Sequence, residues 1–273
     1  MHLFAGNTAF RIVFMPNLDF PTAYIMLKKE RQSFILRQVN IHNKVLSSDL
    51  SMEMSVSEDT IRRDLNELSD DGKIMKVHGG ALSKSFHLSI PHSNVYSLDA
   101  KKTIAQKAVH LIKDGMFVLT TGGTTIIELA KALPAELSAT FITGSIPAAH
   151  EYTHHPNIEL IFIGDKVSKI SQITVGGEAI SKIRQLKADL CILGTNALDI
   201  QYGLTDNDWD VVQVKKAMIE SSEKVVSLSI SEKLNTSQRI KVCDLKEINV
   251  LITELHPSDE ILVEYKNAGL EIL

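Results

Sequence analysis

Two adjacent arginines, Arg62 and Arg63, lie within the segment SEDTIRRDLNELSD at residues 57–70, and such a pair could bind DNA. An arginine side chain can donate two hydrogen bonds to O6 and N7 of guanine, or it can hold a phosphate group. Ser57 and Thr60 stand at the start of the same segment, where hydroxyl groups suit phosphate contacts. The alternative is that the arginines only form ion pairs with acidic residues of their own segment, as most surface arginines do.

A further basic stretch follows at residues 73–82, KIMKVHGGAL. Its second lysine and its histidine could reach an adjacent groove, and a glycine pair lets the backbone approach a partner closely. The predicted DNA-binding residues are Ser57, Thr60, Arg62, Arg63, Lys76, His78, Gly79 and Gly80.

Glycine and threonine occur together in GGTT, residues 122–125, between an apolar segment and a helical one. Backbone N–H groups that converge at the start of a helix can bind an anion, although a glycine turn by itself more often serves packing. Polar residues also end the apolar segments at 139–149 and 189–199. Since ligands of α/β proteins bind at the carboxyl ends of strands, we predict an anion pocket that includes Gly122, Gly123, Thr124, Thr125, Thr143, Gly144 and Ser145.

The arginines need a helix to present them, and residues 57–70 predict one. Ser57 is a favourable N-cap, and acidic residues in the first turn complement the helix dipole. Ile61, Leu65 and Leu68 line one face at spacings of four and three residues, which leaves the arginines on the outer face.

The neighbouring segments complete a winged helix-turn-helix. A helical pattern begins at Lys28, and a second short helix is predicted at 46–54 with Ser47 or Ser48 as its N-cap. Two short strands around a glycine turn are predicted at 73–82. In this fold the second helix of the motif enters the major groove of DNA.

Apolar segments alternate with helical ones in the rest of the chain. The predicted buried strands are MFVLTT, ATFITG, IELIFIG, ADLCILG, KVVSLSI and INVLITE, and the predicted helices are KKTIAQKAVHLIK, TIIELAKAL and VVQVKKAMIESS. This alternation is typical of a sheet covered by helices on both faces. The predicted fold class is α/β: a small winged helix-turn-helix domain followed by a larger three-layer α/β domain with a mostly parallel sheet.

The predicted domains are an atypical, disordered extension at 1–25, the winged helix-turn-helix at 26–82, a linker at 83–98 and the α/β domain at 99–273. Four of the nine phenylalanines fall in the first 20 residues, without a regular period or the pattern of a signal peptide. One hypothesis is that the functional chain begins at Met26.

The composition restricts the function classes. The chain has 273 residues, is 44% hydrophobic and carries a formal net charge of −4. It has no apolar run of the roughly 18 residues that a membrane-spanning helix needs. Cys191 and Cys243 are too few for a disulfide framework, which favours a reducing compartment. The histidines in EYTHHPN, near Pro156, predict a solvated turn, so no metal site is expected.

The segments KKERQSFIL, VSEDTIRRDLNEL and VHGGAL together resemble the N-terminal domain of the DeoR family of bacterial transcriptional regulators. The resemblance continues over about residues 26–273. It implies that Thr60, Arg62 and Arg63 make the main DNA contacts.

The C-terminal half of that family is similar to ribose-5-phosphate isomerase and usually senses a phosphorylated sugar or a related metabolite. The resemblance implies that Lys101, Lys233 and the 122–125 loop bind phosphate. Ile230, Gly144 and the pair Asn196-Ala197 depart from the family pattern, which puts the usual effector in doubt. Lys215, also assigned to the effector site, stands where the isomerases have a carboxylate base, so we expect binding without catalysis.

The sequence therefore predicts a regulator without catalytic residues or a cofactor, and specifically a repressor of an operon for sugar or carbohydrate catabolism. Its predicted partners are a double-stranded DNA operator, a small phosphorylated metabolite and further copies of itself, as a homo-dimer or homo-tetramer. The predicted location is the bacterial cytoplasm, on the nucleoid. Two alternatives stay open: an isomerase-like enzyme with an accessory DNA-binding domain, and an architectural DNA binder with a degenerate pocket.

Overall fold

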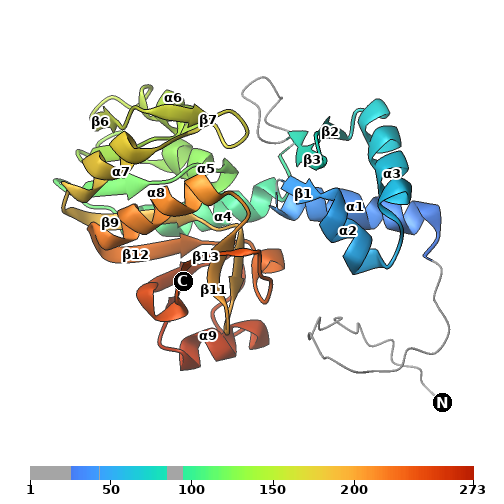
Figure 1. The fold of residues 1–273 in the computed structure, drawn as a ribbon. Coiled ribbons are helices and arrows are strands. Elements are labelled where there is room, and N and C mark those ends of the chain that lie inside the picture. The colour runs from blue at the N-terminus through green and yellow to red at the C-terminus, as the bar shows by residue number, and fades with distance from the viewer. Residues whose placement is uncertain (1–25, 43, 85–94) are drawn as a thin grey trace, which may run out of the picture.

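The computed structural model describes residues 26–42, 44–84 and 95–273. The predicted extension at 1–25 and most of the predicted linker lie outside these ranges. Figure 1 shows a small N-terminal domain, coloured blue to cyan, beside a larger α/β domain.

The small domain has the elements of a winged helix-turn-helix. In chain order these are α1 (Lys28–His42), β1 (Lys44–Leu46), α2 (Ser47–Met54), α3 (Glu58–Asp70), β2 (Ile74–Val77) and β3 (Gly80–Ser83). Ser57 caps α3, since its hydroxyl accepts a hydrogen bond from the backbone N–H of Thr60 at 3.3 Å. Ile61, Leu65 and Leu68 are buried, as their spacing predicted, and they share a core with α1.

The predicted cap of α2 is wrong. Leu46 is the N-cap residue and provides no side-chain hydrogen bond, while Ser47 lies inside the helix and is buried. The reason is that β1 runs directly into α2, and the backbone N–H of Ser47 donates to the carbonyl of Gly79 at 2.8 Å. β1, which the sequence did not indicate, pairs with β3 in an antiparallel sheet of order β1-β3-β2.

The larger domain is a three-layer α/β structure. A seven-stranded parallel sheet has the order β15-β14-β12-β9-β4-β5-β6. Its strands are β4 (Phe117–Thr120), β5 (Thr140–Thr143), β6 (Glu159–Phe162), β9 (Ala188–Gly194), β12 (Ser222–Leu228), β14 (Val250–Ile252) and β15 (Glu271–Ile272). The predicted fold class is confirmed.

Helices cover both faces of this sheet (Figure 1). α4 (Leu98–Val109), α5 (Thr124–Ala132) and α6 (Ile146–Tyr152) pack on one face, and α7 (Gly177–Arg184) and α8 (Trp209–Glu220) pack on the other. Each face of the sheet has its own hydrophobic core, and neighbouring strand residues alternate between them. Val118 and Phe141 belong to the core shared with α4, α5 and α6, while Leu119 and Ile142 belong to the core shared with α7 and α8.

Shorter elements complete the domain. They are β7 (Lys166–Ser168), β8 (Ile173–Val175), β10 (Ala197–Asp199), β11 (Gly203–Asp206), η3 (Ser231–Lys233), β13 (Ile240–Cys243), η4 (Leu245–Glu247), η5 (Glu260–Leu262) and α9 (Val263–Asn267). β10, β11 and β13 form a separate antiparallel sheet.

The six predicted strands all lie in the large sheet, but β6 is not buried as predicted. It forms an edge of the sheet, where the side chain of Phe162 is 45% exposed. An apolar strand sequence therefore did not distinguish an edge from the centre.

The order of the strands identifies where a ligand should bind. The chain proceeds from β4 toward the β6 edge and then returns to β9 on the other side of β4. The loops after β4 and β9 consequently diverge, which opens a crevice at their carboxyl ends. The 122–125 loop and Thr195 lie at these two ends. None of the helices within the described ranges is both long and apolar enough to cross a membrane.

Candidate DNA-reading surface and effector pocket

The two arginines of α3 lie on its exposed face. Arg62 donates to Glu58 at 3.3 Å, and Arg63 donates to Asp59 at 2.7 Å, so the ion pairs expected under the alternative interpretation do form in the free protein. Exposed pairs four residues apart stabilise a helix by only about 0.3–0.5 kcal/mol. A DNA phosphate or a guanine could therefore replace either carboxylate at small cost.

The other predicted DNA-binding residues divide into exposed and internal ones. The hydroxyl groups of Ser57 and Thr60 lie 2.9 Å apart at the start of α3. Lys76 and His78 are exposed on the wing, where the Lys76 ammonium donates to the side-chain oxygen of Asn66. Gly79 is exposed in the turn between β2 and β3.

Gly80 lies inside the sheet. A Cβ atom at this position would stand 1.9 Å from the backbone oxygen of Val45, so only glycine allows β1 to approach β3. The close approach at Gly80 is therefore internal to the domain, and the prediction that Gly80 contacts DNA is wrong.

A cavity of about 110 Å³ lies at the crevice between β4 and β9. Its size suits a small metabolite rather than a drug-sized ligand. The predicted loop residues Gly122, Gly123, Thr124 and Thr125 line one wall. In the same wall α5 begins at Thr124, so the N-terminus of that helix faces the cavity.

The floor of the cavity carries two buried lysines. Lys233 is buried, and its ammonium donates to the backbone oxygen of Thr195 at 2.7 Å. Burial, with the charges of Lys101 and Lys215 nearby, lowers the pKa of Lys233 to about 7. A bound anion would favour the charged form of this lysine.

Lys215 is held by a carboxylate. Its ammonium lies 2.7 Å from Asp206 and also donates to the carbonyl of Gly194 at 3.2 Å. Asp206 further accepts from the side chain of Asn196 at 3.1 Å, and its pKa is lowered by Lys215 and by backbone donors despite its burial. Lys215 therefore adds little net positive charge to the cavity.

Four predicted effector residues do not line this cavity. Lys101 is buried, but its ammonium donates to the backbone oxygen of Tyr96 at 2.5 Å, and burial lowers its pKa to about 8. The Thr143 hydroxyl donates to Thr120 at 2.8 Å, and Ser145 caps α6.

Gly144, the fourth, contacts a neighbouring element. A Cβ atom at this position would stand 2.2 Å from the hydroxyl of Thr174, which donates to the carbonyl of Ile163 at 2.6 Å. The space that a longer side chain would need is therefore taken by β8.

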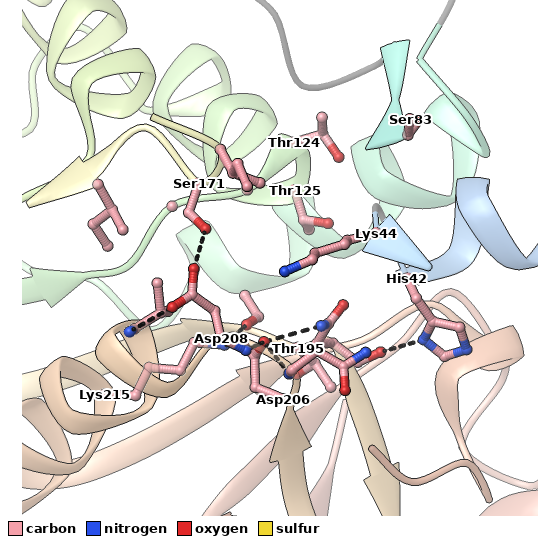
Figure 2. Close-up of a pocket in the computed structure, with 18 of the residues that line it drawn as sticks. His42, Lys44, Ser83, Thr124, Thr125, Ser171, Thr195, Asp206, Asp208 and Lys215 are labelled. Atoms are coloured by element: carbon pink, nitrogen blue, oxygen red, sulfur yellow. Dashed lines mark hydrogen bonds and ion pairs between the residues drawn. The ribbon is translucent and has the colours of Figure 1, made fainter. Parts of the chain in front are cut away.

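The cavity is also lined by residues outside the predicted effector set. Asp208 accepts from the Ser171 hydroxyl at 3.1 Å and caps α8 (Figure 2). Four others come from the small domain: His42, Lys44, Leu82 and Ser83. Asp206 and Asp208 stand shortly before the helix predicted from VVQVKKAMIESS, and no local pattern indicated the residues of the small domain.

The histidine-rich segment is also accounted for. A ring nitrogen of His155 lies 2.7 Å from the carbonyl of Pro134, and one of His154 lies 2.8 Å from the carbonyl of His150. Within the described ranges, no three His, Cys, Asp or Glu side chains form a group that could hold a metal ion.

A winged helix-turn-helix joined to an α/β domain with a cavity at the carboxyl ends of its strands defines a ligand-responsive DNA-binding regulator. Comparison with known proteins agrees. Residues 97–255 match the DeoR C terminal sensor domain, and residues 31–86 match the DeoR-like helix-turn-helix domain. The chain therefore belongs to the DeoR family, as the sequence motifs indicated.

Individual relatives align over most of the chain. The HTH-type transcriptional regulator GlpR of Haloferax volcanii is 32% identical over 251 residues, covering 91% of this chain and 98% of that protein. The glycerol-3-phosphate regulon repressor of Haemophilus influenzae is 29% identical over 231 residues, covering 84% of this chain and 90% of that protein. Among solved structures, ribose 5-phosphate isomerase A of Methanocaldococcus jannaschii aligns with 50% of this chain and 54% of its own at 22% identity, with a TM-score of 0.37. Family membership makes the protein a transcriptional regulator and not an isomerase.

Proposed function

We propose that the protein represses an operon for sugar or related carbohydrate catabolism, and that a phosphorylated sugar in the cavity changes its affinity for the operator. The observation that carries this proposal is the cavity itself. It combines the N-terminus of α5, the glycine and threonine loop at 122–125 and the buried ammonium of Lys233. Each of these favours an anionic group.

Repression is supported by the similarity to the Haemophilus regulon repressor. Arg62 and Arg63, with Ser57, Thr60, Lys76, His78 and Gly79, form the proposed DNA-reading surface. One winged helix makes few base contacts, so the proposal includes a homo-dimer or homo-tetramer on repeated half-sites in the cytoplasm.

The test is binding to the DNA upstream of the protein's own gene, at fixed salt, with a panel of sugar phosphates. We expect specific binding that one class of compound weakens or strengthens. The same compound should stabilise the protein by about 2.7 kcal/mol at 100 times its dissociation constant. Specific DNA binding that no panel member alters, without any thermal stabilisation, would contradict the proposed effector class.

A matched pair of variants separates the two functions. Arg63→Ala should reduce DNA binding and leave stabilisation by the sugar phosphate unchanged, because α3 lies outside the cavity lining. Thr124→Val should reduce stabilisation by the sugar phosphate and leave DNA binding without the compound unchanged, since it removes a hydroxyl from the cavity wall. If both variants lost both functions, the division of work between the two domains would be wrong.

A further inference from the structure

The effector cavity is not formed by the sensor domain alone. His42 and Lys44, from the end of α1 and the start of β1, line it opposite the 122–125 loop. Figure 2 shows the Lys44 side chain extending from the small domain toward Thr125 and Thr195. The DNA-binding domain therefore closes one side of the cavity.

Lys44 differs from the other lysines of the cavity in its bonding. Lys215 donates to Asp206, and Lys233 donates to Thr195. The ammonium of Lys44 has no hydrogen bond or ion pair with any residue in the described ranges, and its side chain is only half-buried. The three N–H donors of this ammonium thus line the cavity without an acceptor among the described residues.

Its neighbour His42 contributes no compensating charge. The ring is buried, and a nitrogen of the ring lies 3.2 Å from the backbone oxygen of Asn196 in the sensor domain. Burial, with the charge of Lys233 nearby, lowers the pKa of His42 to about 4, so the ring is neutral at pH 7. Lys44 is therefore the cation that the small domain brings to the described lining of the cavity.

Polar contacts on either side hold this junction together. Arg37 of α1 donates to Glu232 of η3 at 3.2 Å, and Arg239 donates to Asp49 of α2. Glu232 also accepts from the hydroxyl of Tyr96 at 2.8 Å. Since the arginine of each ion pair is more than half exposed, each pair contributes little, and the junction can change its geometry at low cost.

We propose that Lys44 is a direct ligand of the effector's anionic group, so that the bound effector bridges the DNA-binding domain and the sensor domain of one chain. This inference rests on the proposed function and specifies how the same cavity is regulated. The effector binds between Lys44 on one side and the 122–125 loop with Lys233 on the other. It consequently favours the docked arrangement of the two domains over any arrangement that withdraws Lys44.

The docked arrangement fixes α3, because β1 leads directly into α2 and pairs with β3 of the wing. By linkage, an effector that prefers this arrangement must change the affinity for an operator that prefers another, and the operator must change effector affinity by the same factor. The coupling requires only contact within one chain.

The test measures the affinity of the full chain for inorganic phosphate and for glycerol 3-phosphate, ribose 5-phosphate, glucose 6-phosphate and fructose 1-phosphate by calorimetry. The panel member that binds most tightly is then the probe for all variants. Lys44→Met should weaken its binding about tenfold or more, because a hydrogen bond between charged groups is lost. Lys44→Arg should stay within about threefold of the wild type, since it keeps the charge.

Two further variants serve as controls. Lys73→Met removes an exposed lysine of the same domain that pairs with Asp71 at 3.0 Å, and it should leave probe affinity unchanged. Lys233→Met removes the cation on the sensor side and should weaken binding at least as much as Lys44→Met. Amide hydrogen exchange of β1 should slow when the probe binds the wild type, and should slow less in saturated Lys44→Met.

The outcomes are distinct. Wild-type affinity in Lys44→Met, together with a loss of binding in Lys233→Met, would overturn this inference and leave the proposed effector class intact. No measurable binding of any panel member to the wild type would reject the effector class, and this inference with it.

Discussion

The ion pair between Lys215 and Asp206 permits a quantitative test of how the floor of the cavity is stabilised. The two side chains are 6% and 10% exposed, and their charged atoms lie 2.7 Å apart. Lys215→Met would leave the Asp206 carboxylate buried without a cation. Removing one partner of a buried pair costs about 3–5 kcal/mol.

The lower end of that range is expected here. Asp206 would keep three donors: the side chain of Asn196 at 3.1 Å and the backbone N–H groups of Asn207 at 2.7 Å and Asp208 at 3.3 Å. A loss of about 3 kcal/mol corresponds to a fall in melting temperature of about 6–12 °C for a domain of this size. Lys215→Met combined with Asp206→Asn removes both charges, keeps an acceptor for the donors, and should recover stability to within about 1 kcal/mol of wild type.

Urea unfolding followed by the fluorescence of Trp209, the single tryptophan of the chain and the first residue of α8, measures these differences. Arg184→Met is the matched control, because Arg184 and Glu220 form an exposed ion pair. Their charged atoms lie 3.2 Å apart, and their side chains are 58% and 56% exposed. That variant should change the free energy of unfolding by less than about 1 kcal/mol.

The pH dependence supplies a second measurement. In the wild type the pKa of Asp206 is lowered, so the carboxylate contributes stability above its unfolded pKa, and this contribution is lost as the pH falls. Without Lys215, burial should raise that pKa, so the deficit of Lys215→Met should shrink as the pH is lowered from 7 to 5. A deficit below about 1 kcal/mol at pH 7, or a double variant less stable than the single one, would refute this reasoning.

Three further predictions concern the cavity, the DNA surface and the wing. Since the pKa of Lys233 is lowered to about 7, the unfolded chain binds more protons than the folded one between pH 7 and 10, and wild-type stability should rise with pH in that range. Lys233→Met should therefore be more stable than the ligand-free wild type at pH 7, and its advantage should be smaller at pH 9. Thermal unfolding at both pH values measures this difference. Arg62→Ala and Arg63→Ala should each weaken operator binding. In titrations at several salt concentrations, the slope of log affinity against log salt concentration should fall by about one for whichever arginine contacts phosphate. Unchanged affinity in both variants would remove α3 from the DNA-reading surface. Gly80→Ala should destabilise the small domain by at least about 3 kcal/mol in urea unfolding, because its Cβ would overlap the backbone oxygen of Val45, and near wild-type stability would show that β1 does not pair as described.

Local sequence signals predicted the elements well. The cap at Ser57 and the apolar spacing of Ile61, Leu65 and Leu68 identified α3, because helix capping and amphipathic spacing act within a few residues. The apolar segments identified six strands of the large sheet for the same reason. The pattern could not place β6 at the edge, since an edge is defined by which strands are its neighbours.

The site was predicted only in part. The 122–125 loop and Lys233 line the cavity, because a loop at the end of a strand keeps its position wherever the sheet forms. The family resemblance also assigned Lys101 to the phosphate site, but its ammonium donates to the Tyr96 backbone and it does not line the cavity. His42 and Lys44 reach the cavity only through the docking of two domains, and no periodicity in their own segment encodes that contact.

The alternation of strand residues between two separate cores restricts how this protein can diverge. Val118 and Leu119 are adjacent in β4 but contribute to opposite cores. One inserted or deleted residue in that strand would exchange the two faces and expose both sets of side chains to the wrong neighbours. Length changes are better tolerated in the loops beyond the strand ends, and the connection from β4 to α5 beside the cavity is one such loop. New effector preferences can therefore evolve by altering loops, while the sheet that supports them stays the same.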